Sequence, residues 1–249
     1  MKDYDASTYG DRIADVYDQW YESAAFLDRD AAVETLADLA VDGPALELAV
    51  GTGRIALPLR ERGVEVHGID ASEAMVAKLR GKPGGDAIPV TIGDFADVAV
   101  DGRFRLVYVV FNTFFALDSQ DEQIRCFENV AAHLTEDGVF VIEAFVPEPD
   151  RFDGSVRVSK IDADMVQLDA ALVDRAEQRS ESQHVVITPA GATFYPVRIR
   201  WSYPSELDLM ARLAGLRLRQ RWSGWRGESF TKTSPRHVSV YERATEAAR

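Results

Sequence analysis

Two patterns of hydrophobic and polar positions divide this chain. Between Pro44 and Pro147, apolar runs of strand length alternate with segments whose apolar residues recur at helical spacing. This alternation predicts a parallel sheet with helices on both faces and a ligand site at the carboxyl ends of its strands. Beyond Pro147, apolar and polar residues alternate one by one, which predicts antiparallel strands. These strands are expected at 156–161, 165–173, 182–188 and 193–201, with a hairpin turn at 189–192.

The order of these patterns predicts an α/β fold with four regions. A helical segment rich in aromatic residues comes first, and the antiparallel strands are followed by a helix at 205–214 and strands at 216–222 and 237–242. We expect these last elements to return to the main sheet. The regions are an N-terminal helical lid (1–40), a Rossmann-like cofactor-binding core (41–150), an antiparallel β cap for substrate (151–202) and the return to the core (203–249).

The first apolar run contains an acid and ends in a glycine-rich turn. Glu47 precedes Gly51 and Gly53, and the next predicted strand ends at Asp70. The two glycines let the backbone approach a ligand closely, and a carboxylate at Asp70 can accept hydrogen bonds from both hydroxyls of a ribose. The pattern predicts a site for a nucleoside cofactor.

The charge of Glu47 indicates which nucleoside is bound. The segment from Gly51 to Ala56 also fits the dinucleotide fingerprint G-x-G-x-x-G/A. A pyrophosphate, however, would face the Glu47 carboxylate, and like charges repel in a partly dehydrated cleft. S-adenosylmethionine carries an ammonium and a sulfonium, which an acid attracts. A dinucleotide oxidoreductase, or a strand-turn-helix unit without a ligand, remains as an alternative.

These residues resemble the first motif of the class I S-adenosylmethionine-dependent methyltransferases, commonly (D/E)-x-G-x-G-x-G, with Ala49 in place of the first glycine. An alanine is tolerated there if its φ is negative. The resemblance continues at 70–75, 93–95 and 106–113. It implies a Rossmann-like, mostly parallel seven-stranded sheet with an inserted β cap, S-adenosylmethionine as cofactor and S-adenosylhomocysteine as product. The implied cofactor contacts are Glu47, Ala49, Gly51, Thr52, Gly53, Asp70, Ala71, Met75, Asp94, Phe95 and Phe111.

The N-terminal segment resembles the opening of the bacterial amino-sugar N,N-dimethyltransferases, through the tyrosines, glycine and Y-D-x-aromatic-Y element of residues 9–21. The resemblance implies that Tyr21 hydrogen-bonds the methionine carboxylate and that Tyr9 and Tyr17 help to close the site. An amphipathic helix whose tyrosines only pack is the alternative. Those enzymes carry a histidine after the fourth strand. At the same place, residues 114–116 of this chain are Phe-Phe-Ala, which predicts a more apolar pocket.

Methyl transfer is an in-line displacement for which alignment matters most, and a general base is optional. His67, within the second predicted strand, is expected to be a core residue, and His133, near the end of a helix, is expected to be structural. His184 on a cap strand, and with less support His237, could approach the substrate. Tyr195 on the adjacent strand is comparable, so His184 and Tyr195 are the candidate catalytic residues. Aromatic side chains suited to a flat or lipophilic acceptor are Trp20, Phe114, Phe115, Phe145 and Tyr203, with Trp225 as a further member.

Composition narrows the class of protein. The chain has 249 residues, of which 46% are hydrophobic, and its longest apolar runs have strand length, so a cytoplasmic enzyme is expected. Cys126 is the single cysteine, which leaves no intramolecular disulfide or cysteine metal cluster, and no metal is predicted. The net charge of −13 disfavours a nucleic-acid partner. We expect a monomer or homodimer with a small-molecule acceptor and no membrane partner.

Together these features predict an S-adenosylmethionine-dependent methyltransferase acting on a small molecule. N- or O-methylation in bacterial secondary-metabolite (antibiotic) biosynthesis is the favoured reaction. One alternative is S-methylation of a peptide natural product, converting a disulfide to a thioacetal. Another is a non-catalytic module that binds S-adenosylmethionine without turnover.

Overall fold

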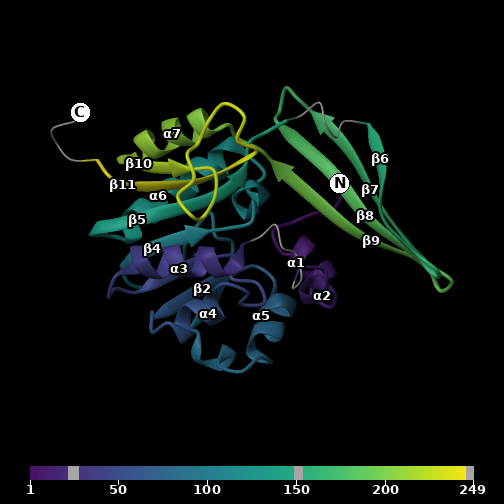
Figure 1. The fold of residues 1–249 in the computed structure, drawn as a ribbon, viewed down its shortest axis with the longest axis horizontal. Helices are drawn as coiled ribbons and strands as arrows, with labels where there is room; N and C mark the ends of the chain where they lie inside the picture. Colours follow the sequence, from purple (N-terminus) through teal and green to yellow (C-terminus); the bar gives the residue numbers. More distant parts are fainter. Residues whose placement is uncertain (22–27, 149–153, 245–249) are drawn as a thin grey trace.

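The computed structural model describes residues 1–21, 28–148 and 154–244, which form a large and a small sheet (Figure 1). The large sheet has seven strands in the order β10-β11-β5-β4-β1-β2-β3, and the small one has four in the order β6-β7-β8-β9. Strands β1 to β5 pair in parallel, whereas β11 runs antiparallel to both β5 and β10. The predicted fold class is confirmed. The predicted boundary at 150/151 lies outside the described residues.

The elements of the large sheet follow the predicted alternation closely. Its strands are β1 (Ala45–Leu48), β2 (Val66–Asp70), β3 (Val90–Ile92), β4 (Phe104–Val109), β5 (Leu134–Phe145), β10 (Leu216–Trp222) and β11 (Arg236–Arg243). Its helices are α3 (Arg29–Ala40), α4 (Ala56–Glu61), α5 (Glu73–Arg80), α6 (Gln120–His133) and α7 (Pro204–Leu213), with 3-10 turns η2 (Gly85–Ala87) and η3 (Thr113–Ala116).

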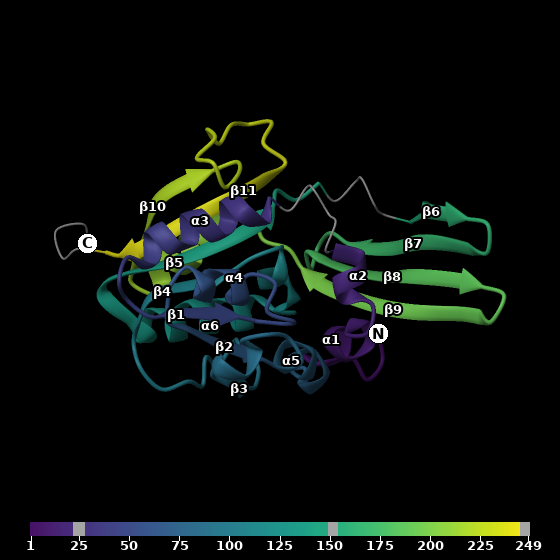
Figure 2. The same ribbon diagram turned by 60° about the horizontal axis from the view of Figure 1, so that its bottom comes forward.

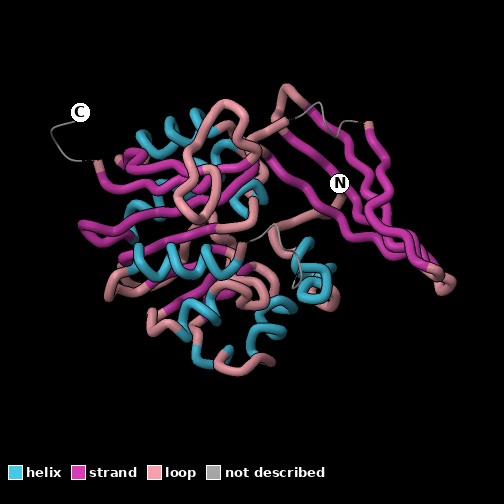
Figure 3. Tube along the Cα trace, in the orientation of Figure 1, coloured by secondary structure: helices cyan, strands magenta, loops and turns pink. Residues whose placement is uncertain are grey.

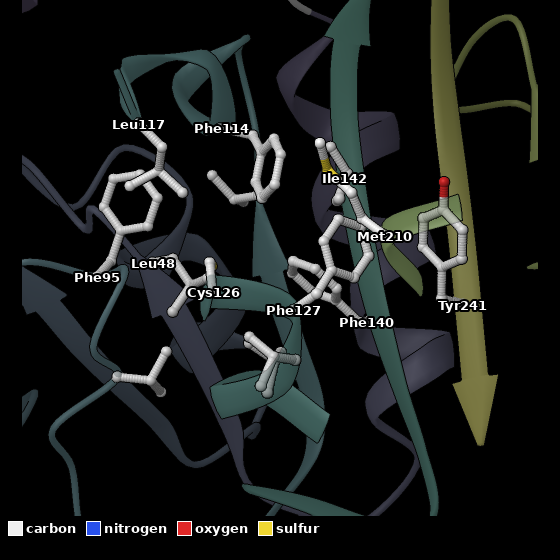
Figure 4. Close-up of a cluster of buried hydrophobic side chains, with 14 of the residues drawn as sticks. Leu48, Phe95, Phe114, Leu117, Cys126, Phe127, Phe140, Ile142, Met210 and Tyr241 are labelled. Atoms are coloured by element: carbon white, nitrogen blue, oxygen red, sulfur yellow. The ribbon is translucent and has the colours of Figure 1, made fainter. Parts of the chain in front are cut away.

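Both faces of the large sheet are buried because successive side chains of a strand point to opposite faces. Ala45, Leu106 and Tyr108 face a cluster formed with α3 and α4, whereas Leu46 and Val107 face a cluster formed with α6 and α7. Figure 4 shows part of the second cluster. There Cys126 is fully buried, and burial raises the pKa of its thiol far above its ordinary value.

Helices that flank the site begin at defined caps. The Ser72 hydroxyl accepts the backbone N–H of Met75 at 3.1 Å and begins α5 directly after β2. Ser119 and Glu122 form a capping box at the start of α6. These caps fix where the loops at the carboxyl ends of β2 and β4 stop, and so position the residues in between.

The small sheet is an antiparallel meander that projects from one end of the large sheet, as Figures 1 and 2 both show. Figure 3 shows that it consists of strands and turns, with two short helices beside its inner end. The four predicted strands and the hairpin turn between the last two are confirmed. The strands are β6 (Ser155–Asp162), β7 (Met165–Asp174), β8 (Arg179–Thr188) and β9 (Gly191–Arg200), and the helices are α1 (Thr8–Ile13) and α2 (Tyr17–Tyr21).

His67 and His133 lie in different surroundings. The side chain of His67 is 29% exposed and pairs with Glu65 at 2.9 Å, so its prediction as a core residue is wrong. His133, in contrast, is structural as predicted, since its ring contacts the carbonyl oxygens of Asn129 and Val100. No helix within the described residues is long and apolar enough to cross a membrane.

Candidate functional site

The loop after β1 is held by the carboxylate that ends β2. Asp70 accepts the backbone N–H of Gly51 at 2.7 Å through Oδ2 and that of Ser72 at 2.8 Å through Oδ1. Burial raises the pKa of Asp70, and these two N–H groups oppose the rise. Asp70 therefore anchors the glycine-rich loop and has further lone pairs to offer a ligand.

The loop backbone differs from expectation at Ala49. Ala49 has φ +57°, in the left-handed region, as do Gly51 at +56° and Gly53 at +78°. The negative φ under which an alanine is tolerated at this position is therefore not met, because alternate residues of this turn are left-handed. Such a conformation costs an L-residue on the order of 1 to 2 kcal/mol. A Cβ at Gly53 would lie 2.3 Å from Leu79 Cδ1, so Gly53 lets α5 pack against the back of the loop.

Glu47 is a buried carboxyl group beside the loop. It is 3% exposed and accepts the Tyr108 hydroxyl at 3.0 Å. Burial raises the pKa of Glu47 to about 8, although the Tyr108 hydrogen bond and the charge of Arg54 act in the opposite direction. A cation bound next to Glu47 would favour its ionised form.

A cavity of about 380 Å³ opens at the carboxyl ends of β1, β2 and β4. Every predicted cofactor contact lines it except Gly53 and Tyr21. Gly53 lies behind the loop, and Tyr21 lines an adjoining cavity of about 580 Å³ under the cap. The two cavities share Tyr9, Tyr17 and Phe111 in their walls. Sequence reasoning thus selected residues that meet in one place.

Arg54 lines the first cavity and was not predicted. Its guanidinium lies over the Phe111 ring, 5.0 Å from the ring centroid. Burial raises the pKa of the Tyr17 hydroxyl, and the nearby Arg54 charge counteracts this. The Nε of Arg54 is buried and has no hydrogen-bond partner among the described residues. The sequence signal for Arg54 was its place directly after the glycine loop, because an arginine beside a ligand site can bind an anionic group of the ligand.

The lid helices are docked onto the loop and onto α5 by acidic side chains. Asp11 accepts the Ser72 hydroxyl at 2.6 Å, and Asp18 accepts the Thr52 hydroxyl at 2.6 Å. Asp18 also pairs with Lys82 at 2.7 Å. The lid therefore rests on the same loop that lines the first cavity.

The lid tyrosines stack toward the end of β4. The Tyr17 and Tyr21 ring centroids are 4.8 Å apart, and Tyr21 meets Phe111 edge-on at 5.0 Å. The Tyr21 hydroxyl lies 3.5 Å from that of Tyr9. Tyr9 and Tyr17 line both cavities and Tyr21 lines the second, so the tyrosines pack against one another and also form part of the cavity walls.

The turn after β4 is fixed from behind by Glu143, which sequence reasoning missed. Phe111 and Asn112 have φ of +58° and +64°. The Phe111 N–H donates to Glu143 Oε2 at 2.9 Å, and the Asn112 side-chain oxygen accepts the Phe145 N–H at 2.7 Å. Trp225 donates to Glu143 Oε1 at 3.0 Å. This network holds Phe111 at the junction of the cavities.

Comparisons with known proteins agree with this geometry. A family model described as a methyltransferase domain matches residues 45–138. The cypemycin N-terminal methyltransferase of Streptomyces sp is 30% identical over 201 residues, covering 80% of this chain and 82% of that protein. The chain is a class I S-adenosylmethionine-dependent methyltransferase.

Solved structures of other methyltransferases share its fold. The CcbJ methyltransferase from Streptomyces caelestis superposes with a TM-score of 0.91 at 39% identity, covering 97% of this chain and 100% of that chain. CalS10, an amino pentose methyltransferase from Micromonospora echinaspora solved with S-adenosylmethionine bound, has a TM-score of 0.68 at 23% identity and covers 92% and 97% of the two chains.

Several aromatic residues predicted for the acceptor lie elsewhere in this methyltransferase. Phe114 and Phe115 are fully buried in the core, edge-on to Phe127 and Phe145 respectively. Neither lines a cavity, so the prediction that they contact an acceptor is wrong; of the segment 114–116, Ala116 lines both cavities. Phe145 does line the second cavity.

The remaining aromatic candidates are also outside the cavity walls. Among the described residues, Tyr203 is 41% exposed at the start of α7, and Trp225 is buried against Glu143. Trp20 packs edge-on against Tyr195 and His184, with ring centroids 4.9 and 6.2 Å away. Neither Tyr203 nor Trp225 is therefore placed to contact an acceptor, and Trp20 packs against His184, which lines the second cavity.

The two remaining histidines have different surroundings. His237 is fully buried, its Nδ1 lies 2.8 Å from the Ser239 hydroxyl, and burial lowers its pKa to about 3. It cannot approach a substrate. His184 lines the second cavity, and Tyr195 lies directly across from it in the β8–β9 pairing.

Proposed function

We propose that this methyltransferase transfers the methyl group of S-adenosylmethionine to a nitrogen or oxygen of a small molecule in natural-product biosynthesis, releasing S-adenosylhomocysteine. The observation that carries the proposal is the junction of two cavities at Tyr9, Tyr17 and Phe111. The first has the donors and acceptors that the cofactor needs, and the second lies beneath the cap. An in-line displacement requires the two reactants to meet end to end, which such a junction allows.

The first cavity fits the cofactor group by group. Asp70 would accept the ribose hydroxyls, and Asp94 the adenine amino group. Glu47 would pair with the ammonium. Arg54 would bind the methionine carboxylate, which would give its partnerless Nε an acceptor, and the Tyr21 hydroxyl would reach the same carboxylate from the wall of the second cavity. The remaining predicted contacts that line the cavity would pack against adenine and sulfur, namely Tyr9, Tyr17, Ala49, Gly51, Thr52, Ala71, Met75, Phe95 and Phe111.

The ribose assignment has its own test. Asp70→Ala should weaken S-adenosylhomocysteine binding by about 1.5 to 3 kcal/mol, because two hydroxyls lose a charged acceptor. Asp86→Asn, a change at an exposed turn, serves as the control. Calorimetry on both variants gives the dissociation constants. A loss below a few tenths of a kcal/mol in Asp70→Ala would exclude the ribose role.

Nitrogen is the acceptor atom that similar proteins favour. The names of two of them specify N-terminal methylation and an amino pentose substrate. Phe114 and Phe115, which favoured the sulfur alternative through an apolar pocket, are buried in the core and line neither cavity. They therefore do not support sulfur as the acceptor atom.

Transfer can be tested with matched probe acceptors. The purified chain is incubated with S-adenosylmethionine labelled in its methyl group and one of four probes. These are a nucleotide-linked amino sugar, the same sugar with a hydroxyl in place of the amine, a short peptide with a free N-terminus and a disulfide-containing peptide. Mass spectrometry should detect label on an amine or hydroxyl probe. Label on the disulfide probe alone would contradict the proposal.

A further inference from the structure

The cap carries a row of polar side chains that crosses four strands. The pairing of β6, β7, β8 and β9 sets Arg157 opposite Asp169, Asp169 opposite His184 and His184 opposite Tyr195. Directly opposed residues of paired strands project from the same face of a sheet. Within this row, His184 Nδ1 and Asp169 Oδ1 are 2.6 Å apart.

This pair opens into the second cavity. Asp169 and His184 both line it, and their side chains are 38% and 28% exposed. The neighbouring β8 residues on the same face, Ser180 and Ser182, are small and line the same cavity. No described residue hydrogen-bonds His184 Nε2. The second ring nitrogen is therefore available to a molecule in the cavity.

The lid connects this pair to the junction of the cavities. Tyr21 lines the same cavity and contacts Phe111, which belongs to both cavities. Burial raises the pKa of Tyr21, and the nearby Asp169 carboxylate adds to the rise. The charged and titratable groups around His184 are thus Asp169 from β7, Tyr195 from β9 and Tyr21 from α2, with Arg157 opposite Asp169.

We propose that His184 and Asp169 act as a pair that removes a proton from the acceptor, with His184 as the catalytic base and Asp169 as its positioning residue. The inference rests on the proposed function and adds a residue and a substrate class to it. Asp169 accepts the Nδ1–H of His184, which fixes the tautomer with an unprotonated Nε2 facing the cavity. The charge of Asp169 then stabilises the imidazolium that forms.

The substrate class follows from the balance of the step. A lone pair on the acceptor atom forms the bond to the methyl carbon, and the carbon–sulfur bond breaks with its electron pair passing to sulfur. The proton of the acceptor passes to Nε2 and later to water. A hydroxyl can lose it as the methyl group is transferred, whereas an ammonium must lose it beforehand, because its nitrogen has no lone pair until then. The acceptor must therefore carry a proton on the reacting atom, as a hydroxyl or an ammonium does. A disulfide sulfur carries no such proton, so the pair could not contribute to its methylation.

The tautomer of His184 tests the pair without any acceptor. Nitrogen NMR on the full chain, with the His184→Asn variant used for assignment, should show the Nδ1–H tautomer. Asp169→Asn should shift His184 to the Nε2–H tautomer, because an amide can donate to Nδ1 where a carboxylate can only accept. Asp164→Asn makes the same chemical change in an exposed turn of the cap and should leave the tautomer unchanged.

Turnover on the probe that the wild type methylates fastest completes the test. His184→Asn should lower kcat about a hundredfold and Asp169→Asn at least about tenfold, with S-adenosylhomocysteine affinity unchanged in both. An Nε2–H tautomer in the wild type, or equal kcat for Asp169→Asn and Asp164→Asn, would overturn the pair. No transfer by the wild type to any nitrogen or oxygen probe would instead contradict the proposed function, which keeps the two failures apart.

Discussion

At the residue scale, the cofactor cavity contains two buried carboxyl groups in unlike surroundings. Asp70 receives two backbone N–H groups, whereas Glu47 is almost fully buried, and the Tyr108 hydroxyl, the Arg54 charge and the Ala56 backbone N–H compensate its burial only in part. Burial therefore leaves Glu47 with a pKa of about 8. Near neutral pH and with no cation bound, the Glu47 carboxyl group is therefore protonated. A bound ammonium would displace this proton.

Binding of the cofactor product should consequently release a proton. At about pH 7, S-adenosylhomocysteine should displace about one proton from Glu47, and its affinity should rise with pH up to about 8. Calorimetry in buffers of different ionisation enthalpy measures the proton count. Glu47→Gln should bind without proton release, and proton release that persists in this variant would contradict the assignment.

The same group links stability to pH. Its pKa is raised from 4.5 to about 8 on folding, so the stability it contributes is fully present below pH 4.5 and lost as pH rises through about 8. Chemical denaturation of the ligand-free chain should show this decline. The decline should be smaller in Glu47→Gln, and equal pH slopes for the two proteins would argue against the raised pKa.

Ala49 stores backbone strain that a substitution can release. Since its φ is +57°, Ala49→Gly should raise the free energy of unfolding by about 1 kcal/mol. Gly51→Ala, at φ +56° in the same loop, is the matched reverse change and should lower it. Denaturant titration measures both. A loss of stability in Ala49→Gly would show that the alanine conformation carries no strain.

At the element scale, the lid combines packing with contacts to the site. Its acidic side chains bind the glycine loop and α5, and its tyrosines reach the junction of the cavities. Helices as short as α1 and α2 are not stable alone, so these contacts hold them in place. The lid and the cofactor loop should therefore respond to ligand together.

Tyr21→Phe separates the two roles of the lid. The ring and its packing on Tyr17 and Phe111 are retained, so the thermal midpoint of the ligand-free chain should hardly change. Loss of the hydroxyl should weaken S-adenosylhomocysteine binding by about 1 kcal/mol. Tyr203→Phe, on the exposed residue before α7, is the control. Equal losses of stability and affinity in Tyr21→Phe would favour a packing role alone.

At the scale of the whole molecule, the two sheets line different cavities. The large sheet presents the cofactor cavity at its carboxyl edge, and the small sheet covers the second cavity with one face. Specificity among related enzymes of one fold arises in the parts added to the common core. We therefore expect acceptor choice to reside in the cap.

Filling the second cavity should block the acceptor without affecting the cofactor. Ser182→Trp places a large ring on the cavity face of β8 and should lower kcat/KM at least about tenfold, with S-adenosylhomocysteine affinity unchanged. Ile187→Trp, on the opposite and exposed face of the same strand, should keep both values. Steady-state kinetics with the best probe acceptor decides between the outcomes. Parallel losses of turnover and cofactor affinity in Ser182→Trp would mean that the cavities are not separate.

The sequence by itself determined the strands, the glycine loop and the meeting of most predicted cofactor residues in one cavity. Those features follow from local information, because the apolar period sets the type of element and the carboxyl ends of parallel strands must share one edge. Glu47, Asp70 and Asp94 could thus be assigned to one site before their distances were known, and they line one cavity.

Only the tertiary structure decided which face each side chain meets. Alternation along a strand defines two faces without saying which one covers the site, so the pairing of Asp169 with His184 depends on strand register. The turn after β4 likewise sends Phe114 into the core and leaves Phe111 at the cavity junction. Register and turn geometry are set by contacts between distant segments, and no local pattern encodes them.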